Sequence, residues 1–184
     1  MSDILVKDIM IPLDQYATVD ENANLYDAVM ALEACQAKAD VRDPRAVLVV
    51  DNKNHVVGKL SLLDVIKALE PSYEKILESR PGFGRLGFSH RFLKLLADDY
   101  KLWSNPLEQI CRKAADIKVK DIMYSPSSEG EYVDEDATLP EALHQVIMGH
   151  HQSLLVMKKK HITGILRVRE LFEQVTEAMK ACGL

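Results

Sequence analysis

The sequence has few cysteines and no long apolar run. The cysteines are only three, Cys35, Cys111 and Cys182, and no two of them stand in a C-x-x-C spacing, which indicates reduced thiols and no disulfide framework. No apolar stretch approaches the roughly 20 residues that a membrane-spanning helix needs, and the first residues lack the basic and apolar regions of a signal peptide. We therefore expect a cytoplasmic protein without a membrane partner.

An excess of positive charge is also absent. The 184 residues include 23 lysines and arginines against 28 aspartates and glutamates, which gives a formal net charge of −5, and the two signs are interspersed. A nucleic acid held through its phosphates needs a basic face on the protein, so we expect no nucleic-acid partner. A chain of this length can form one domain of ordinary size or two small ones.

One stretch of the chain recurs about a hundred residues later. Residues 47–69, VLVVDNKNHVVGKLSLLDVIKAL, predict a strand, a turn, a second strand and a helix. Residues 154–175 repeat this order, with Gly164 in the place of Gly58. The recurrence indicates an internal duplication.

The pentapeptide V-K-D-I-M opens each copy, at residues 6–10 and 119–123. Each copy continues with a short strand and an amphipathic helix, and Asn24 and Thr138 are placed to cap these helices. The first copy carries about eight extra residues, 35–43, before its second strand. Each repeat is thus expected to run lead-in, strand, helix, strand, strand, helix.

Residues 70–116, between the copies, match neither of them. Ser89 is placed to cap a helix that carries Trp103, and the Asn105-Pro106 pair is placed to open another helix through residues 107–114. We expect a helical connector that packs against some other part of the molecule.

The connector contains a literal G-x-G-x-x-G at residues 82–87. A dinucleotide-binding loop of this kind follows a strand in a βαβ unit, whereas Pro81 and a charged helical pattern over residues 74–80 come before this one. A loop between helices explains the motif more simply, and a small enzyme that binds nicotinamide there stays open as a hypothesis. Arg85 and Arg91 could instead reach a phosphate bound by the repeats.

Ser61 and Asp64 follow Gly58 at the expected start of a helix. Free N–H groups at a helix start attract anions, and a hydroxyl with a carboxylate three residues on suits a phosphate and a ribose diol. The same pair is an ordinary helix-capping pattern. The residues alone therefore allow a ligand site or a simple cap.

Paired repeats that open on K-D-I-M and close on G-h-h-x-x-x-[DE], where h is apolar, resemble the cystathionine-β-synthase (CBS) domain family. The resemblance implies an α+β fold in which tandem CBS repeats, residues 1–69 and 117–184, pack about a pseudo-twofold axis into one module, with the connector, residues 70–116, between them. It also implies a stand-alone regulatory module that binds AMP, ADP, ATP or S-adenosylmethionine between the repeats. Such modules commonly form homodimers and act on a regulated protein, which the sequence does not identify.

The resemblance also assigns ligand-binding roles in the first repeat. Gly58 opens the family signature, Ser61 donates to a ligand phosphate, and Asp64 accepts from the ribose hydroxyls. The adenine is expected to lie against apolar strand residues, for which the counterparts are Ala17, Val47 and Leu48.

The second repeat departs from the signature, with Arg167 in place of the hydroxyl residue and Glu170 in place of the aspartate. Arg167 could face a phosphate as a cation, but we expect one occupied site per chain. We expect no catalytic residues and no required cofactor, because no paired carboxylates or activated nucleophile are evident. The spacing of His144, His150 and His151 does not suit a metal. The alternative function is a ligand-free scaffold for dimerisation or protein interaction.

Overall fold

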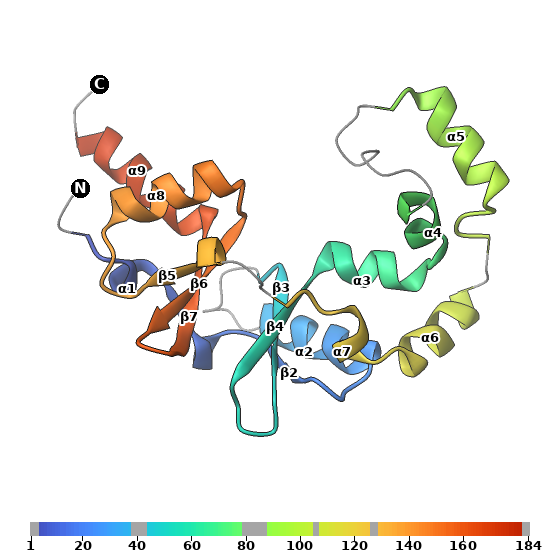
Figure 1. The fold of residues 1–184 in the computed structure, drawn as a ribbon, viewed down its shortest axis with the longest axis horizontal. Coiled ribbons are helices and arrows are strands. Elements are labelled where there is room, and N and C mark those ends of the chain that lie inside the picture. Colours follow the sequence, from blue (N-terminus) through green and yellow to red (C-terminus); the bar gives the residue numbers. More distant parts are fainter. Residues whose placement is uncertain (1–3, 38–43, 79–87, 105–106, 126–128, 182–184) are drawn as a thin grey trace.

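The computed structural model describes residues 4–37, 44–78, 88–104, 107–125 and 129–181. These residues form an α+β fold with two small sheets (Figure 1). The first sheet has the order β2-β3-β4 and consists of β2 (Thr18–Asp20), β3 (Ala46–Val50) and β4 (Val56–Ser61). The second has the order β1-β7-β6-β5 and consists of β1 (Ile11–Pro12), β7 (His161–Arg167), β6 (Ser153–Lys158) and β5 (Tyr132–Asp134).

Helices pack on both sheets, and further helices lie in the described part of the connector. The first sheet packs against α2 (Leu25–Gln36) and α3 (Leu62–Leu69), and the second packs against α8 (Leu139–Gly149) and α9 (Val168–Ala181). The connector holds α4 (Ser72–Glu78), α5 (His90–Asp99) and α6 (Leu107–Asp116). The described residues also form short helical turns: α1 (Val6–Ile9), η1 (Leu13–Gln15), α7 (Val119–Ile122) and η3 (Glu129–Glu131). The expected order of elements is confirmed in both copies.

The two hairpins have the same construction. β3 pairs with β4 in antiparallel fashion, with Val49 opposite Gly58, and β6 pairs with β7 with Val156 opposite Gly164. The strand that precedes each hairpin pairs with it in parallel, as β2 does with β3 and β5 with β6. The matched register of the two glycines confirms the internal duplication.

Each lead-in packs on the opposite repeat. Val6 of α1 is fully buried in the core of the second repeat, and Val119 of α7 is fully buried in the core of the first. The backbone repeats this exchange, because the N–H of Val6 donates to Ala137 O and the N–H of Val119 donates to Ala23 O, each over 2.9 Å. Figure 1 shows α1, in blue, beside the orange elements of the second repeat. Neither repeat therefore completes its core alone.

A third apolar cluster joins the two sheets. Tyr16 and Leu48 from the first half of the chain pack with Leu155 and Ile165 from the second, and all four are buried. Ile11 of β1 also pairs with Ile165 of β7 across the boundary. Full burial of one large apolar side chain contributes about 1.5–3 kcal/mol, so this cluster holds the repeats together as one module.

The connector is helical, but one of its helices is shorter than expected. The Ser89 cap is confirmed, because Ser89 Oγ accepts from the N–H of Phe92 over 3.3 Å. The helix ends at Asp99, however, and Trp103 lies in a turn with a left-handed φ of 57°. The N–H of Trp103 donates to the Glu70 carboxylate over 3.0 Å, so it makes no helical bond.

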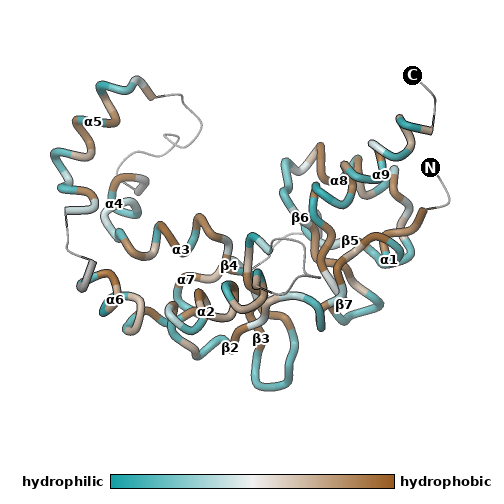
Figure 2. The backbone as a smooth tube through the Cα atoms, turned by 180° about the vertical axis from the view of Figure 1, so that it is seen from behind, coloured by the Kyte–Doolittle hydropathy of each residue, from teal (hydrophilic) through white to brown (hydrophobic). Residues whose placement is uncertain are grey.

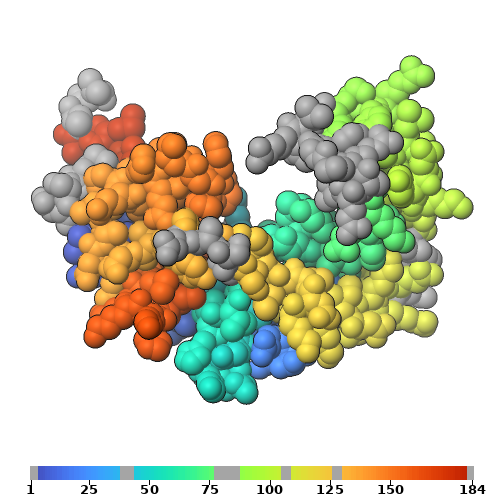
Figure 3. All heavy atoms as spheres, in the orientation of Figure 1, coloured from blue at the N-terminus to red at the C-terminus, as the bar shows by residue number. Residues whose placement is uncertain are grey.

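Figure 1 shows α5 apart from both sheets, and Figure 3 shows a broad notch between the connector and the second repeat.

Several sequence expectations fall on residues that the structure does not describe. These are the 82–87 motif with Arg85, the Asn105-Pro106 pair, and residues 38–43 of the first-repeat insertion. Cys35 and Cys111 are free thiols. None of the helices in the described part of the chain has the length and hydropathy that a bilayer crossing requires.

Candidate functional site

Ser61 and Asp64 meet where β4 ends and α3 begins. Ser61 Oγ accepts from the N–H of Asp64 over 3.2 Å. The Asp64 carboxylate in turn accepts from the Ser61 N–H over 2.9 Å and from the Ser61 hydroxyl over 2.6 Å. The pair therefore forms a complete capping box. A ligand bound by these side chains has to share or replace these bonds.

Asp64 also lines a small pocket beside this cap. The pocket has a volume of about 190 Å³, whereas sites for whole drug-sized ligands measure roughly 300–1,000 Å³. It can therefore hold one part of a nucleotide, such as its ribose. Its walls come from α3, α4, α7 and the residue after α7, through Asp64, Lys67, Ala68, Tyr73, Glu74, Asp121, Ile122 and Met123.

The expected adenine contacts lie on two different faces of the first sheet. Ala17 and Val47 belong to the core of the first repeat, and Leu48 belongs to the cluster between the repeats. Successive side chains of a strand point to opposite faces, so Val47 and Leu48 cannot both line one adenine through their side chains. Contact of an adenine with this region stays a prediction.

Gly58 has a packing reason of its own. A Cβ at this position would lie 2.8 Å from Met123 Sδ and 3.0 Å from Tyr124 O, and a Cβ at Gly164 would lie 2.4 Å from Ile11 O. Both glycines therefore let the lead-in of the opposite repeat cross the sheet closely. This explains why a glycine opens the signature even in the repeat whose other signature residues differ.

A polar cluster that the sequence did not reveal lies next to Gly58. The Tyr124 hydroxyl donates to the carboxylate of Glu131, which is 5% exposed. Lys59 Nζ lies 3.9 Å from Glu131 Oε2 and 5.4 Å from the centre of the Tyr124 ring. The only signal in the sequence is a lysine inside an otherwise apolar strand. Because side chains alternate along β4, Lys59 and Ser61 lie on the same face.

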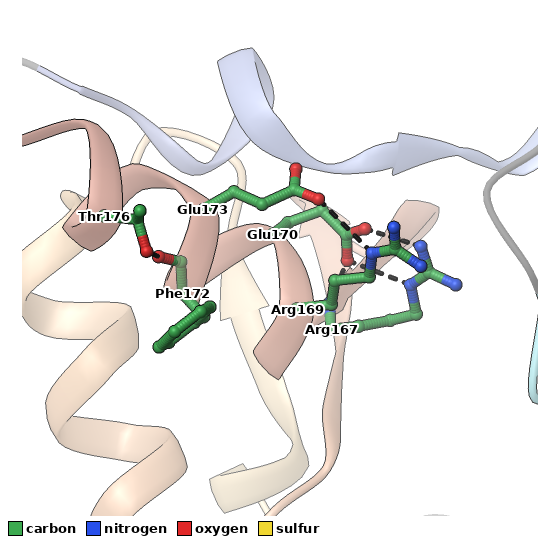
Figure 4. A network of polar contacts seen from close by, with 6 residues as sticks. All are labelled: Arg167, Arg169, Glu170, Phe172, Glu173 and Thr176. Carbon is green, nitrogen blue, oxygen red and sulfur yellow. Dashed lines mark hydrogen bonds and ion pairs between the residues drawn. The ribbon is translucent and has the colours of Figure 1, made fainter.

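In the second repeat, an ion pair between Arg167 and Glu170 occupies the position that corresponds to Ser61 and Asp64 (Figure 4). The Arg167 guanidinium donates to both carboxylate oxygens of Glu170, over 2.9 and 2.5 Å. The backbone N–H of Arg167 donates to the same carboxylate over 3.3 Å. The two residues are 6% and 3% exposed. A phosphate that binds Arg167 here has to compete with a buried carboxylate in bidentate geometry.

Tyr16 lies within the electrostatic reach of this pair. Burial raises the pKa of Tyr16 to about 12, with the positive charge of Arg167 acting against the rise and the negative charge of Glu170 adding to it. Tyr16 belongs to the first half of the chain, whereas Arg167 and Glu170 belong to the second. At this point of the junction between the repeats, an uncharged phenol therefore lies near an ion pair whose charges cancel.

Of the three histidines whose spacing was considered for a metal, His144 lies within α8, whereas His150 and His151 lie at and after its end. His150 ends α8 in a left-handed conformation, with φ 51°. Among the described residues, no group of three or more histidine, cysteine, aspartate or glutamate side chains is arranged to hold a metal ion.

A model of the CBS domain matches the chain twice, over residues 6–71 and 119–177. These regions make up more than half of the chain and coincide with the two repeats. The chain belongs to the CBS domain family. A comparison with curated protein sequences gave no match.

Solved structures of CBS-domain proteins share the fold of the whole module. A CBS domain-containing protein of unknown function from Kribbella flavida is 21% identical, with a TM-score of 0.59 over 94% of this chain and 98% of its own. CBSX2 in complex with AMP is 17% identical, with a TM-score of 0.57 over 95% and 98%. The CBS domain of a bacterial CNNM/CorC family Mg2+ transporter in complex with ATP is 12% identical, with a TM-score of 0.60 over 95% and 89%. The chain is thus a tandem CBS module.

Proposed function

We propose that this CBS module binds one adenosyl ligand per chain beside Ser61 and Asp64, and that binding changes how it associates with a protein partner. The observation that carries the proposal is the complete signature of Gly58, Ser61 and Asp64 at a strand-to-helix junction, next to a pocket lined by Asp64. A carboxylate only accepts hydrogen bonds and so suits a ribose diol. CBS structures of the same fold in complex with AMP and with ATP support this ligand class.

The polarity of the pocket suggests how the ligand is oriented. Asp64, Glu74 and Asp121 give the pocket three carboxylates against the single ammonium of Lys67. Phosphates are repelled by such a lining, so we expect the ribose to lie in the pocket. The phosphates then point toward the start of α3, where Ser61 and the cation of Lys59 share one face of β4.

A thermal-shift panel of AMP, ADP, ATP and S-adenosylmethionine tests the proposed site. A ligand at a hundred times its dissociation constant adds about 2.7 kcal/mol to the free energy of unfolding, which corresponds to roughly 5–10 °C in Tm. We expect one compound to give such a shift and Asp64→Ala to abolish it. The matched control is Glu141→Ala, because Glu141 forms the same capping box with Thr138 at the start of α8. Each substitution breaks one cap, and only the first touches the site.

One observation favours a second candidate, a ligand-free scaffold. The capping box already gives Ser61 and Asp64 a structural role. If nucleotide-free, folded protein shows no shift with any compound, and if Asp64→Ala and Glu141→Ala cost the same stability, the proposed ligand site is wrong and the scaffold function is supported.

We also propose that the module forms a homodimer through helix faces that this chain leaves exposed. Leu63 and Ile66 of α3 are 58% and 50% exposed, and Phe172 and Met179 of α9 are 67% and 64% exposed. Ile66 and Phe172 occupy equivalent positions, each two residues after the acidic signature residue. The tube of α3 is mostly brown in Figure 2. Large apolar side chains that recur at equivalent exposed positions fit a partner of the same symmetry, a second copy.

Phe172→Glu is expected to convert the dimer into a monomer, because it places a charge at the centre of the proposed interface. Size-exclusion chromatography with light scattering measures the mass directly. Lys180→Glu, on the exposed polar side of the same helix, is the control and should leave the dimer intact. A wild-type chain that is monomeric at high concentration would contradict the proposal.

A further inference from the structure

We propose that occupation of the pocket beside Asp64 is transmitted to the connector through Tyr73 and Trp103, so that the connector reports the ligand state of the module. This inference rests on the proposed adenosyl site and names the element that site regulates. It involves three residues of one contact network, Glu70, Tyr73 and Trp103, here called the connector clamp.

The connector supplies one wall of the pocket. Lys67 and Ala68 come from α3, whereas Tyr73 and Glu74 come from α4, the first connector helix. A ligand between these walls touches both helices at once. Its binding therefore favours one position of α4 relative to α3, which is the differential contact that any ligand-driven change requires.

Tyr73 joins this pocket wall to the far end of the connector. The Trp103 indole N–H donates to the Tyr73 hydroxyl over 3.1 Å, and the two ring centroids lie 6.4 Å apart. The residues are 30 positions apart in the chain, with α5 between them. A displacement of Tyr73 must therefore move the indole or break this bond.

Glu70 holds the other side of the clamp. Its carboxylate is 5% exposed and accepts from the backbone N–H of Trp103 over 3.0 Å. Although burial acts to raise the pKa of Glu70, hydrogen bonds from Trp103 and Ser72 hold it below its usual value. The carboxylate is therefore ionised at neutral pH, and bonds to an ionised acceptor are the stronger kind. This bond anchors the left-handed turn at Trp103 to the end of α3.

The last connector helix is tied to the same point. Lys113 Nζ of α6 donates to the carbonyl of Leu69, the last residue of α3, over 3.3 Å. The start of α4, the turn after α5 and the body of α6 therefore converge on the C-terminal end of α3, the helix that Ser61 and Asp64 begin. A rearrangement at the pocket has a short path to all three connector helices.

Trp103 is the only tryptophan of the chain, so intrinsic indole fluorescence reports the clamp. Emission and Tm are measured in parallel while AMP, ADP, ATP or S-adenosylmethionine is added in turn. We expect the compound that raises Tm also to change the emission of Trp103, with both effects saturating at the same concentration. In Tyr73→Phe, measured at a concentration that saturates this variant, the emission change is expected to be lost. Tyr100→Phe, an exposed tyrosine that ends α5 away from the pocket, should keep it.

The outcomes separate this inference from the function on which it rests. A rise in Tm without a change in Trp103 emission overturns the transmission to the connector and leaves the ligand site intact. An emission change that persists at saturation in Tyr73→Phe overturns the role of Tyr73. If no compound raises Tm, the ligand site is wrong, and the inference falls with it.

Discussion

Gly164→Ala is expected to lower the free energy of unfolding by about 3 kcal/mol, the upper end of the usual cost of overpacking. The added Cβ would lie 2.4 Å from the backbone carbonyl oxygen of Ile11. That oxygen belongs to β1, which pairs with β7 and follows the α1 turn buried in the second repeat. Because the obstacle is backbone held on both sides, the contact cannot be relieved by turning a side chain.

Two other glycines serve as a graded control in the same unfolding experiment. At Gly58 the nearest atom is the flexible Met123 Sδ at 2.8 Å, with Tyr124 O at 3.0 Å, so Gly58→Ala should cost about 1–2 kcal/mol. At Gly149 the three atoms nearest to the added methyl all belong to the His151 ring, which can turn aside, so Gly149→Ala should be nearly neutral. For this chain length a loss of 3 kcal/mol lowers Tm by roughly 6–12 °C. Equal Tm values for Gly164→Ala and Gly149→Ala would show that the lead-in does not hold its position.

The elements of each repeat could be predicted because their signals are local. Alternating and helical apolar patterns, a capping residue at Asn24 or Ser61, and a glycine after the hairpin each act within a few residues. The structure places β3, β4 and α3 where the 47–69 pattern predicted them. The packing of the two repeats into one module followed from the family resemblance.

The exchange of the lead-ins could not be predicted from the residues. V-K-D-I-M is identical in both copies, so its sequence holds no information on which repeat it completes. Val6 and Val119 are equally apolar and equally buried. The choice depends on where the chain crosses between the sheets, which is a tertiary property.

The predicted extent of the helix after Ser89 was wrong for a related reason, since the helix ends at Asp99 and not at Trp103. Its apolar spacing continues to Trp103, but a carboxylate 33 residues earlier, on Glu70, takes the Trp103 N–H and favours a turn. Local propensity is a weak prior when a buried partner from another element competes for the backbone. The candidate site has the same ambiguity, because the atoms of Ser61 and Asp64 that form a cap are those that would bind a ligand.

Arg167→Met is expected to destabilise the module by about 3–5 kcal/mol, the usual cost of breaking a buried ion pair. It leaves the Glu170 carboxylate, 3% exposed, without the guanidinium that donates to both of its oxygens. Adding Glu170→Gln removes the uncompensated charge. The amide oxygen of the glutamine still offers an acceptor to the backbone N–H of residue 167. The double variant should therefore recover to within about 1–2 kcal/mol of the wild type. Urea unfolding of the wild type, Arg167→Met, Glu170→Gln and the double variant gives the coupling energy of the pair.

The neighbouring pair in Figure 4 provides the control, since Arg169 Nε donates to Glu173 Oε1 over 3.2 Å on the exposed face of the same helix. Their side chains are 56% and 35% exposed, so Arg169→Met should cost at most about 0.5 kcal/mol. A buried bidentate pair and a neighbouring exposed pair thus differ several-fold in expected cost because one carboxylate can be solvated by water and the other cannot. If Arg167→Met and Arg169→Met cost the same, Glu170 reaches solvent in solution. The position that corresponds to Ser61 and Asp64 in the second repeat would then be open to a ligand, which would contradict the single site per chain.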